Sequence, residues 1–349
     1  MKGNLILLTI SLIIALALVE MGLRITGRYA TYTERTDTGS YVSPFQVGYG
    51  ESWYRVHAPN QKIAYQNKEF SASWITNNEG FDDKTFSVTK QGKRIMVLGD
   101  SFTEGSGAPN DSSYPRQLAD IIKDSVDAPV EVWNCGVGGS DLFYEFVLFR
   151  DKLLKYKPDM AVVTINNTDI YETMIRGGFE RFGKDRKTHY KKGPWFEPLF
   201  EHSYVVRAIA IDAFGYGFSF IKKSEDQQLR ETAMDELCIA MDSFSVLCKE
   251  KNIALSFAFH PMQSEMESRD KYFAVKQIAH CGKLGYDYVD AREQFYKMGI
   301  DADSAKKLYW SIDGHFNPTG YHYLAWCVWE NIKEKIKQYQ LSDRGIRNG

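Results

Sequence analysis

Two kinds of hydrophobic pattern alternate along the chain from residue 94 onward. Short apolar runs predict buried strands, and longer segments with apolar residues at helical spacing predict helices between them. The predicted strands cover residues 94–98, 130–133, 160–165, 253–259 and 286–289. The predicted helices cover residues 113–124, 142–156, 229–249, 269–283 and 319–337. Strands that alternate with helices favour a parallel sheet covered on both faces, which is an α/β fold.

The first segment of the chain follows a different pattern. Residues 5–19 are apolar apart from two hydroxyl side chains, and apolar residues resume after Glu20. Crossing a bilayer takes roughly 20 residues, which residues 4–25 supply if the charged side chains extend toward the head groups. We therefore predict an uncleaved signal anchor, a transmembrane helix over residues 1–28. The alternative is a signal peptide cleaved near the small residues 15–17.

The remaining chain divides into an appendage and a main domain. Residues 29–90 are polar and aromatic without steady periodicity, and we predict an N-terminal appendage packed on the main domain. The main domain covers residues 91–340, with an insertion at about 171–226. A connection this long is usually functional or carries structure of its own. Its basic residues indicate either a solvated cover or a lid or patch facing an anionic lipid or glycan; they include Arg181, Lys184, Arg186, Lys187, Lys191 and Lys192.

Composition and charge narrow the classes of function. With 43 Lys and Arg against 45 Asp and Glu, the formal net charge is -2, which offers no global field for binding nucleic acid. The five cysteines form no C-x-x-C pair, so neither a zinc ribbon nor a disulfide framework is indicated. A nucleotide-dependent enzyme is disfavoured because the chain has neither a P-loop nor a dinucleotide-binding motif.

Candidate chemistry lies where the first two predicted strands end, because reactive groups in open α/β sheets gather beyond the carboxyl ends of the strands. The first strand leads into Gly99-Asp100-Ser101, where glycine permits a sharp turn and Ser101 would begin a helix with its hydroxyl exposed. This setting suits a nucleophilic serine; the alternative is that Ser101 or Asp100 only caps the helix. The glycines of residues 136–139 follow the second strand. They would present backbone N–H groups to an oxyanion or phosphate, or simply allow tight packing.

Three further polar groups are predicted at the same edge. Residues 166–169, Asn-Asn-Thr-Asp, follow the third strand and either join the site or cap the next segment. Asp313 and His315 stand two positions apart before the last helix. Asp313 can orient the ring of His315, whose other nitrogen can take the proton of Ser101. His260, after the fourth strand, either lines the pocket or belongs to a plain strand-ending turn.

This ordered set of motifs resembles the four blocks of the SGNH, or GDSL-type, hydrolase family over about residues 94 to 330. Residues 77–81, Asn-Asn-Glu-Gly-Phe, further resemble a membrane-anchored bacterial branch of that family. The resemblance implies a flavodoxin-like three-layer α/β/α domain and ester hydrolysis through an acyl-enzyme, without metal or other cofactor. It implies that Ser101 is the nucleophile, that the backbone N–H groups of Ser101 and Gly139 contribute to the oxyanion hole, and that Asp313 and His315 are the acid–base pair.

The chain departs from the family pattern at two places. The third block is usually Gly-x-Asn-Asp, and here Thr168 occupies the place of the oxyanion asparagine. Losing one such donor costs about a hundred- to thousand-fold in rate. Activity therefore requires the Thr168 hydroxyl, or a re-aimed amide of Asn166 or Asn167, in that position. In addition, one residue rather than the usual two separates Asp313 from His315.

The sequence thus predicts a membrane-anchored serine ester hydrolase whose main domain is extracytoplasmic, periplasmic or at the cell surface. Its predicted substrates are O-acyl groups of an envelope glycan or lipid, with acyl transfer to a glycan as an equivalent outcome of the same acyl-enzyme. The altered third block motivates an alternative from another class, a catalytically weak SGNH-like module for binding or assembly in the cell envelope.

Overall fold

The computed structural model describes residues 2–31, 34, 56–109, 112–185, 187–189, 191–267 and 272–347. Among these residues, a five-stranded sheet forms the centre, in the spatial order β4-β3-β5-β6-β7, and every neighbouring pair is parallel. Counted along the chain this order is 2-1-3-4-5, that of flavodoxin-like doubly wound sheets. The strands are β3 (Lys93–Leu98), β4 (Val130–Asn134), β5 (Met160–Ile165), β6 (Ala254–Phe259) and β7 (Tyr288–Asp290). All five predicted strands are present.

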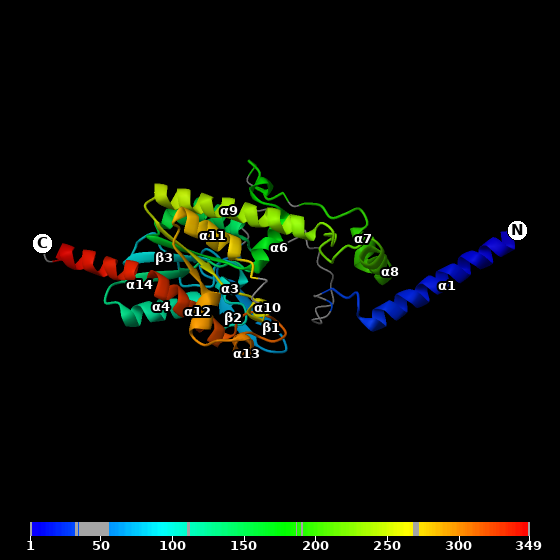
Figure 1. Ribbon diagram of the computed structural model, residues 1–349, viewed down its shortest axis with the longest axis horizontal. Coiled ribbons are helices and arrows are strands. Elements are labelled where there is room, and N and C mark those ends of the chain that lie inside the picture. Colours follow the sequence, from blue (N-terminus) through cyan, green and yellow to red (C-terminus); the bar gives the residue numbers. More distant parts are fainter. Residues whose placement is uncertain are drawn as a thin grey trace.

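Helices cover both faces of this sheet (Figure 1). Alternate side chains of a strand point to opposite faces, so Ile95 and Val97 pack in one buried cluster and Met96 and Leu98 in the other. The first cluster includes residues of α4 (Tyr114–Ser125), α12 (Ala291–Lys297) and α14 (Pro318–Arg347). The second includes residues of α5 (Leu142–Leu148), α9 (Asp226–Glu250) and α11 (Val275–Leu284). The predicted three-layer α/β/α architecture is thereby confirmed.

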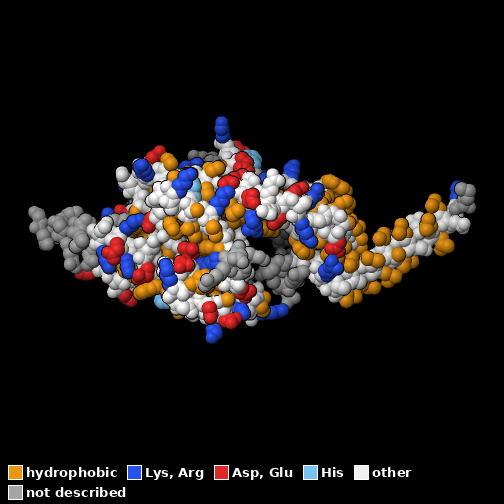
Figure 2. Space-filling view, viewed as in Figure 1, with side chains coloured by type: hydrophobic (Ala, Val, Ile, Leu, Met, Phe, Trp, Pro, Cys, Tyr) orange, Lys and Arg blue, Asp and Glu red, His pale blue; other side chains and the backbone are white. Residues whose placement is uncertain are grey.

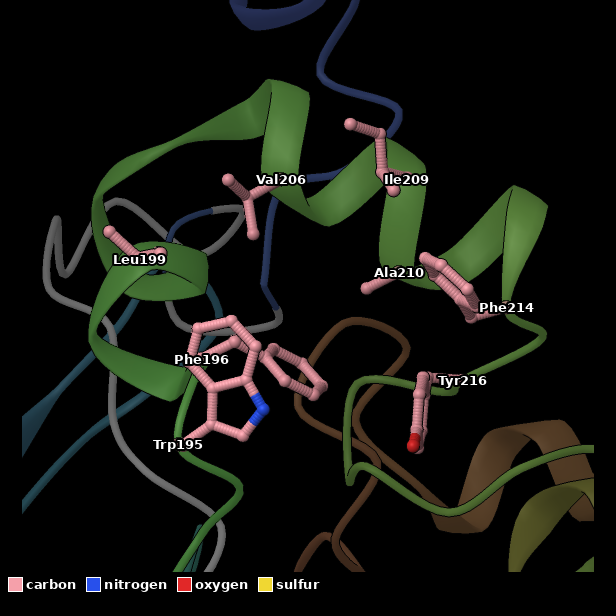
Figure 3. Close-up of a pocket in the computed structure, with 8 residues that line it drawn as sticks. All are labelled: Trp195, Phe196, Leu199, Val206, Ile209, Ala210, Phe214 and Tyr216. Carbon is pink, nitrogen blue, oxygen red and sulfur yellow. The ribbon is translucent and has the colours of Figure 1, made fainter.

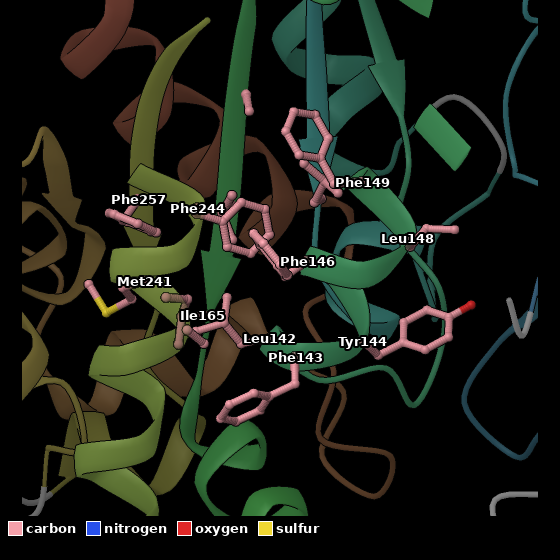
Figure 4. Packing of buried hydrophobic residues seen from close by; sticks show 14 of the residues in the cluster. Leu142, Phe143, Tyr144, Phe146, Leu148, Phe149, Ile165, Met241, Phe244 and Phe257 are labelled. Carbon is pink, nitrogen blue, oxygen red and sulfur yellow. The ribbon is translucent and has the colours of Figure 1, made fainter. Parts of the chain in front are cut away.

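The second cluster contains many aromatic side chains, several of them where α5 packs against α9 (Figure 4). The rings of Phe146 and Phe244 meet edge to face with centroids 5.2 Å apart. Full burial of such a side chain contributes about 1.5–3 kcal/mol. The helix predicted over residues 142–156 changes type within this packing: α5 continues as a π-helix over Phe149–Leu153 and a 3-10 turn over Leu154–Tyr156.

The structure differs from the prediction between β6 and β7. The predicted helix over residues 269–283 begins on residues outside the described ranges, and α11 starts only at Val275. A short helix that the sequence did not indicate, α10 (Gln263–Glu267), precedes it. The buried carboxylate of Glu265 accepts hydrogen bonds from the N–H groups of Met262 and Phe273. This contact joins the start of α10 to the residues just before α11, a link that local periodicity does not reveal.

The insertion after β5 carries structure of its own. It begins within α6 (Asn167–Arg176) and continues through a 3-10 turn over Phe179–Arg181, α7 (Glu197–His202), α8 (Tyr204–Ala208) and a π-helix over Ile209–Ala213. Arg181 is buried and binds both carboxylate oxygens of Asp141, the residue that caps α5. Arg181 therefore forms a structural ion pair rather than part of a surface patch. Arg186 lies outside the described residues.

The N-terminal part contributes a long helix and a hairpin. α1 (Lys2–Thr26) extends away from the body and has no buried residue. Among the described helices it is the one that is long and apolar enough to cross a membrane, with a mean hydropathy of 2.5, and it is compatible with either a membrane anchor or a signal peptide. In the predicted appendage, β1 (Lys62–Gln66) pairs with β2 (Ser71–Ile75) in an antiparallel hairpin. Residues 35–55 of that appendage lie outside the described residues.

Candidate active site

Ser101 lies at the carboxyl end of β3, at the first position of the short helix α3 (Ser101–Glu104). The side chain of Asp100 caps this helix by accepting a hydrogen bond of 2.9 Å from the N–H of Phe102. Gly99 is the residue that allows the turn, because a Cβ at this position would lie 2.0 Å from the Thr103 hydroxyl oxygen. The capping role that the sequence left open between two residues therefore falls to Asp100, and the hydroxyl of Ser101 is left to contact His315.

Ser101, His315 and Asp313 form a continuous chain of contacts. His315 Nε2 lies 2.8 Å from Ser101 Oγ, and His315 Nδ1 lies 2.5 Å from Asp313 Oδ1. Gly314, between the two loop residues, has a φ of +86°, a conformation that favours glycine. This turn brings the carboxylate against the imidazole although only one residue separates them, so the short spacing is compatible with an acid–base pair.

The β1–β2 hairpin supports Asp313 from the other side. Tyr65 Oη and Asn67 Nδ2 each donate to Asp313 Oδ2 over 3.3 Å. The Glu69 carboxylate accepts hydrogen bonds from the backbone N–H groups of Ile312 and Asp313, at 2.9 and 2.8 Å. Burial acts to raise the pKa of Asp313, but the hydrogen bond and charge of His315, together with Tyr65, hold it below its ordinary value. The carboxylate is thus kept ionised beside the imidazole.

Sequence reasoning missed these hairpin contacts. The signal that could have found the hairpin is the polar turn at residues 67–69 between two stretches rich in β-branched, aromatic and small residues. Asn67 makes that turn by accepting hydrogen bonds from the N–H groups of Glu69 and Phe70. No local signal, however, indicates that this turn reaches a loop more than 240 residues further along the chain.

The glycine run after β4 packs against the nucleophile turn. A Cβ at Gly136 would lie 2.2 Å from the backbone nitrogen of Glu104, so this glycine serves close packing. A Cβ at Gly138 would lie 3.9 Å from the Cβ of Ser101, which places the following residue, Gly139, next to the site. Among the described hydrogen bonds, none uses the backbone N–H of Ser101 or of Gly139. Both groups remain available to an oxyanion.

The side chain of Asn166 points toward Asp100, the residue before Ser101. Asn166 caps α6 in a reciprocal arrangement with Asp169, and its side chain is buried. Its Nδ2 donates to Asp100 Oδ2 over 2.9 Å and lies 3.2 Å from Nε2 of His260. Burial lowers the pKa of His260 to about 4, so the neutral ring can accept the second proton of this amide. His260 belongs to this buried network that fixes Asp100.

Thr168 and Asn167 are arranged differently. Thr168 Oγ1 lies 3.1 Å from Asp100 Oδ2 and 2.8 Å from Asn166 Oδ1, and its single proton can serve one of these acceptors at a time. Asn167 Oδ1 accepts a hydrogen bond of 3.2 Å from Arg230 on α9, while no described hydrogen bond uses its Nδ2. The identity of the third oxyanion donor among these three residues stays a prediction.

Two more residues that sequence reasoning did not single out lie beside the site. His57, from the appendage, contacts Glu104 with Nε2 and Oε1 2.9 Å apart. Glu104 ends the helix that Ser101 begins, and its Oε2 would lie 2.7 Å from a Cβ at Gly138.

As for metals, no cluster of three or more His, Cys, Asp or Glu side chains suited to a metal ion occurs among the described residues.

Several carboxyl groups with little solvent exposure lie near Asp100. Burial, together with neighbouring carboxylates, raises the pKa values of Glu145 and Asp169 well above their ordinary range. On α6, burial raises the pKa of Glu172 to about 8, although Arg176 opposes the shift. Arg176 Nη2 lies 3.2 Å from Glu172 Oε1, whereas Oε2 has no hydrogen-bond partner among the described residues. Glu172 is therefore largely protonated in the folded protein at neutral pH.

This raised pKa predicts that the protein loses stability as the pH rises from about 4.5 to 8. The unfolded chain ionises Glu172 near its ordinary pKa, so the favourable contribution of the protonated group is complete below about pH 4.5 and is lost as the pH rises toward 8. We expect Glu172→Gln to raise the free energy of unfolding at pH 8 by on the order of 3 kcal/mol and to change it little at pH 5. Thermal melting of the detergent-solubilised protein at both pH values measures this, with the exposed Glu231→Gln on α9 as control. Equal pH dependence in all three proteins would contradict it.

Comparison with known proteins adds a family match. The family model described as GDSL-like Lipase/Acylhydrolase matches residues 95–328, more than half of the chain. No curated protein sequence matches the chain. Solved structures with similarity include TesA, at 12% identity over 69% of this chain and 99% of that chain, with a TM-score of 0.43. An acetyl xylan esterase from Geobacillus stearothermophilus is 13% identical over 70% and 97% of the chains, with a TM-score of 0.44. A lipase from a goat rumen metagenome is 13% identical over 68% and 95%, with a TM-score of 0.45.

Proposed function

The chain belongs to the GDSL-like lipase/acylhydrolase family, and we propose that it is a membrane-anchored serine ester hydrolase that acts through an acyl-enzyme on Ser101. Membership of this family indicates an acylhydrolase. The identity of the nucleophile and the roles of the other site residues are our proposal. The observation that carries it is the contact chain of Ser101 Oγ to His315 Nε2 at 2.8 Å and His315 Nδ1 to Asp313 Oδ1 at 2.5 Å. A serine and an imidazole within hydrogen-bond distance, with the imidazole oriented by a carboxylate, are the parts that nucleophilic acyl transfer requires.

In the proposed reaction, His315 Nε2 takes the proton of Ser101 while Oγ attacks the carbonyl carbon of the ester. The tetrahedral intermediate collapses as His315 returns that proton to the leaving alcohol oxygen, which leaves the acyl group on Ser101. Water, activated by the same nitrogen, then attacks the acyl carbon and releases the free acid. A sugar hydroxyl in place of water would give acyl transfer, and both outcomes use the same residues.

The negative charge of the tetrahedral intermediate needs fixed donors. We propose the backbone N–H groups of Ser101 and Gly139 for two of them, since neither is used by a described hydrogen bond. The third would be the Thr168 hydroxyl, or a re-aimed amide of Asn166 or Asn167. Asn166 already donates to Asp100 and lies close to His260, so reaching the oxyanion would require it to leave this network.

The proposed substrates are O-acyl groups on a glycan or lipid of the cell envelope. The support is one of location: α1 suits a membrane anchor, and the proposal places the body, residues 29–340, on the extracytoplasmic side. Figure 1 shows α3 and α6, which follow the carboxyl ends of β3 and β5, on the side of the sheet that is turned toward α7, α8 and α1. A site on that side suits a substrate held near the membrane surface.

Labelling with a fluorophosphonate probe tests this function on the full chain in detergent micelles. We expect native protein to label and heat-denatured protein not to label, because only a folded site activates the serine hydroxyl. Trypsin should release the adduct on a peptide that contains Ser101, and fragmentation in the mass spectrometer should place it on that residue. If folded protein stays unlabelled, or the adduct lies on another residue, the enzymatic proposal is wrong, and the alternative of a catalytically weak binding or assembly module takes its place.

A further inference from the structure

Large apolar side chains are exposed on one small part of the insertion. We call residues 195–216, which contain α7, α8 and the π-helix, the platform. Trp195 is 84% exposed and Phe214 is 65% exposed, and Leu199 and Ile209 are about half exposed. Single exposed apolar residues are ordinary on a protein surface, but several gathered within about twenty residues indicate a surface that meets an apolar partner.

These side chains surround an open apolar cavity of about 380 Å³ (Figure 3). Its wall is formed by side chains that all lie within the platform: Trp195, Phe196, Leu199, Val206, Ile209, Ala210, Phe214 and Tyr216. The site of Ser101 and His315 contributes nothing to this wall. The cavity is therefore a feature separate from the proposed catalytic chemistry.

The platform is fixed to the end of α1 by polar and apolar contacts. The carboxylate of Glu20 accepts hydrogen bonds from the N–H groups of Tyr204 and Val205 and from the Ser203 hydroxyl, at 2.9 to 3.0 Å. Arg24 donates to the backbone oxygen of His202 over 2.7 Å. The one acidic residue of α1 is thus paired with the start of α8, which sets the position of the platform along the helix axis.

Apolar packing continues this junction. Tyr29 and Ala30, just after α1, are buried against Tyr204 of α8, and Leu23 packs on the same cluster. In Figure 2, apolar side chains cover α1 and continue onto the end of the body that adjoins it. An apolar medium that surrounds α1 therefore also reaches the platform.

The length of the uncharged run in α1 also favours contact between the bilayer and the platform. Residues 5–19 of α1 are free of charge, and at about 1.5 Å per residue they extend roughly 22 Å, short of the hydrocarbon core of about 30 Å. Crossing the core therefore also requires the part of α1 up to about residue 25, which includes the residues that bind the platform. Glu20, where the uncharged run stops, is one of these residues. Apolar side chains at this level extend the hydrophobic surface of the chain beyond the end of that run.

We propose that the platform inserts its exposed apolar side chains into the interfacial layer of the bilayer that α1 crosses, and that phospholipid acyl chains occupy its cavity. Trp and Tyr side chains, such as Trp195 and Tyr216, are enriched at this depth, and amphipathic surfaces of this kind sink about 5–10 Å into the head-group and acyl boundary. The platform thereby forms a second membrane contact that restrains how the body tilts about α1. The inference rests on the proposed retention of α1 as an anchor.

The test uses the full chain reconstituted in phosphatidylcholine–phosphatidylglycerol vesicles and single cysteines labelled with an environment-sensitive fluorophore. The five native cysteines are buried, so thiol reagents should favour the introduced ones. Ile209→Cys and Phe214→Cys report on the platform, and Leu12→Cys on α1 reports on membrane insertion. Val246→Cys, which replaces an equally exposed apolar residue on α9, is the matched control. Lipids brominated near the top of the acyl chain serve as quencher.

We expect several-fold stronger quenching at positions 209 and 214 than at position 246, together with quenching at position 12. Quenching at position 12 alone would overturn the platform proposal and leave the anchor intact. Quenching at none of the positions would overturn the anchor and with it the platform. Crosslinking between copies at positions 209 and 214, without quenching by lipid, would also overturn the proposal and assign the surface to a second copy of the chain. None of these readouts depends on esterase activity, so failure of the proposed catalytic function would be seen separately.

Discussion

Ser101→Ala is expected to lower kcat for ester hydrolysis by on the order of 10⁴- to 10⁶-fold, to the level that binding and the oxyanion donors alone supply. The reason is that the proposed reaction passes through a covalent acyl group on Oγ, and alanine has no atom to carry it. The hydroxyl contacts His315 at 2.8 Å, so its removal also leaves that base without a proton to take. Hydrolysis of a short-chain nitrophenyl ester by the full chain in detergent measures the effect.

Ser106→Ala is the matched control for this variant, since Ser106 follows α3 on the same turn and its hydroxyl contacts neither His315 nor Asp313 among the described hydrogen bonds. It should retain nearly full activity. Fold integrity is checked by thermal melting, which we expect to be alike in the three proteins because the one described hydrogen bond of the Ser101 hydroxyl is that to His315. Residual activity of Ser101→Ala above a hundredth of the wild type would show that another residue is the nucleophile.

The sheet was predictable from the sequence because its strands are short and buried on both faces. The run from Ile95 to Leu98 is fully buried, and such strands read as continuous apolar segments bounded by turn residues. The places where these strands end follow from the same reasoning. Ser101 and the glycines after β4 could therefore be assigned to one edge of the sheet from the sequence alone, because parallel strands bring their carboxyl ends together.

The contacts that complete the site could not be predicted, because they join segments that are distant in sequence. Tyr65 and Asn67 contact Asp313 although more than 240 residues separate them from it in the sequence. Arg181, which the sequence offered as part of a basic insertion, instead neutralises the buried carboxylate of Asp141. In each case the residue types fit several roles, and the fold selects one of them.

The same limit applies to the third block. The sequence shows that Thr168 stands where the family has an asparagine, but not what its neighbours do. In the structure, Asn166 and Thr168 both contact Oδ2 of Asp100, whose other oxygen caps the nucleophile helix. The third block therefore stabilises the position of Ser101 through Asp100. Loss of Thr168 would weaken this support and would also remove any hydrogen bond that its hydroxyl donates to an oxyanion.

Asp313→Asn is expected to lower kcat by on the order of 10⁴-fold with little change in KM, the magnitude known for this substitution in serine-protease triads. Asp313 accepts a hydrogen bond from His315 Nδ1–H and so keeps the proton on Nδ1, which leaves Nε2 free to act as base toward Ser101. An asparagine amide turned with its nitrogen toward the ring would instead donate to Nδ1 and place the proton on Nε2, the wrong nitrogen for the reaction. Tyr65 and Asn67 both donate to Oδ2, so they favour the orientation of the new amide that puts its nitrogen against the imidazole.

The matched control is Asp303→Asn, an exposed carboxylate on the short helix α13 (Ala302–Ala305) that precedes the same loop. It should leave kcat and KM unchanged. Tyr65→Phe separates orientation from charge: it removes one donor to Oδ2 while the aromatic ring and the carboxylate stay, and we expect a loss of about tenfold or less, in line with one hydrogen bond of about 1 kcal/mol. If Asp313→Asn keeps more than a tenth of the wild-type kcat, the short Asp313–His315 spacing does not form an acid–base pair, and His315 must be oriented by the backbone of its loop alone.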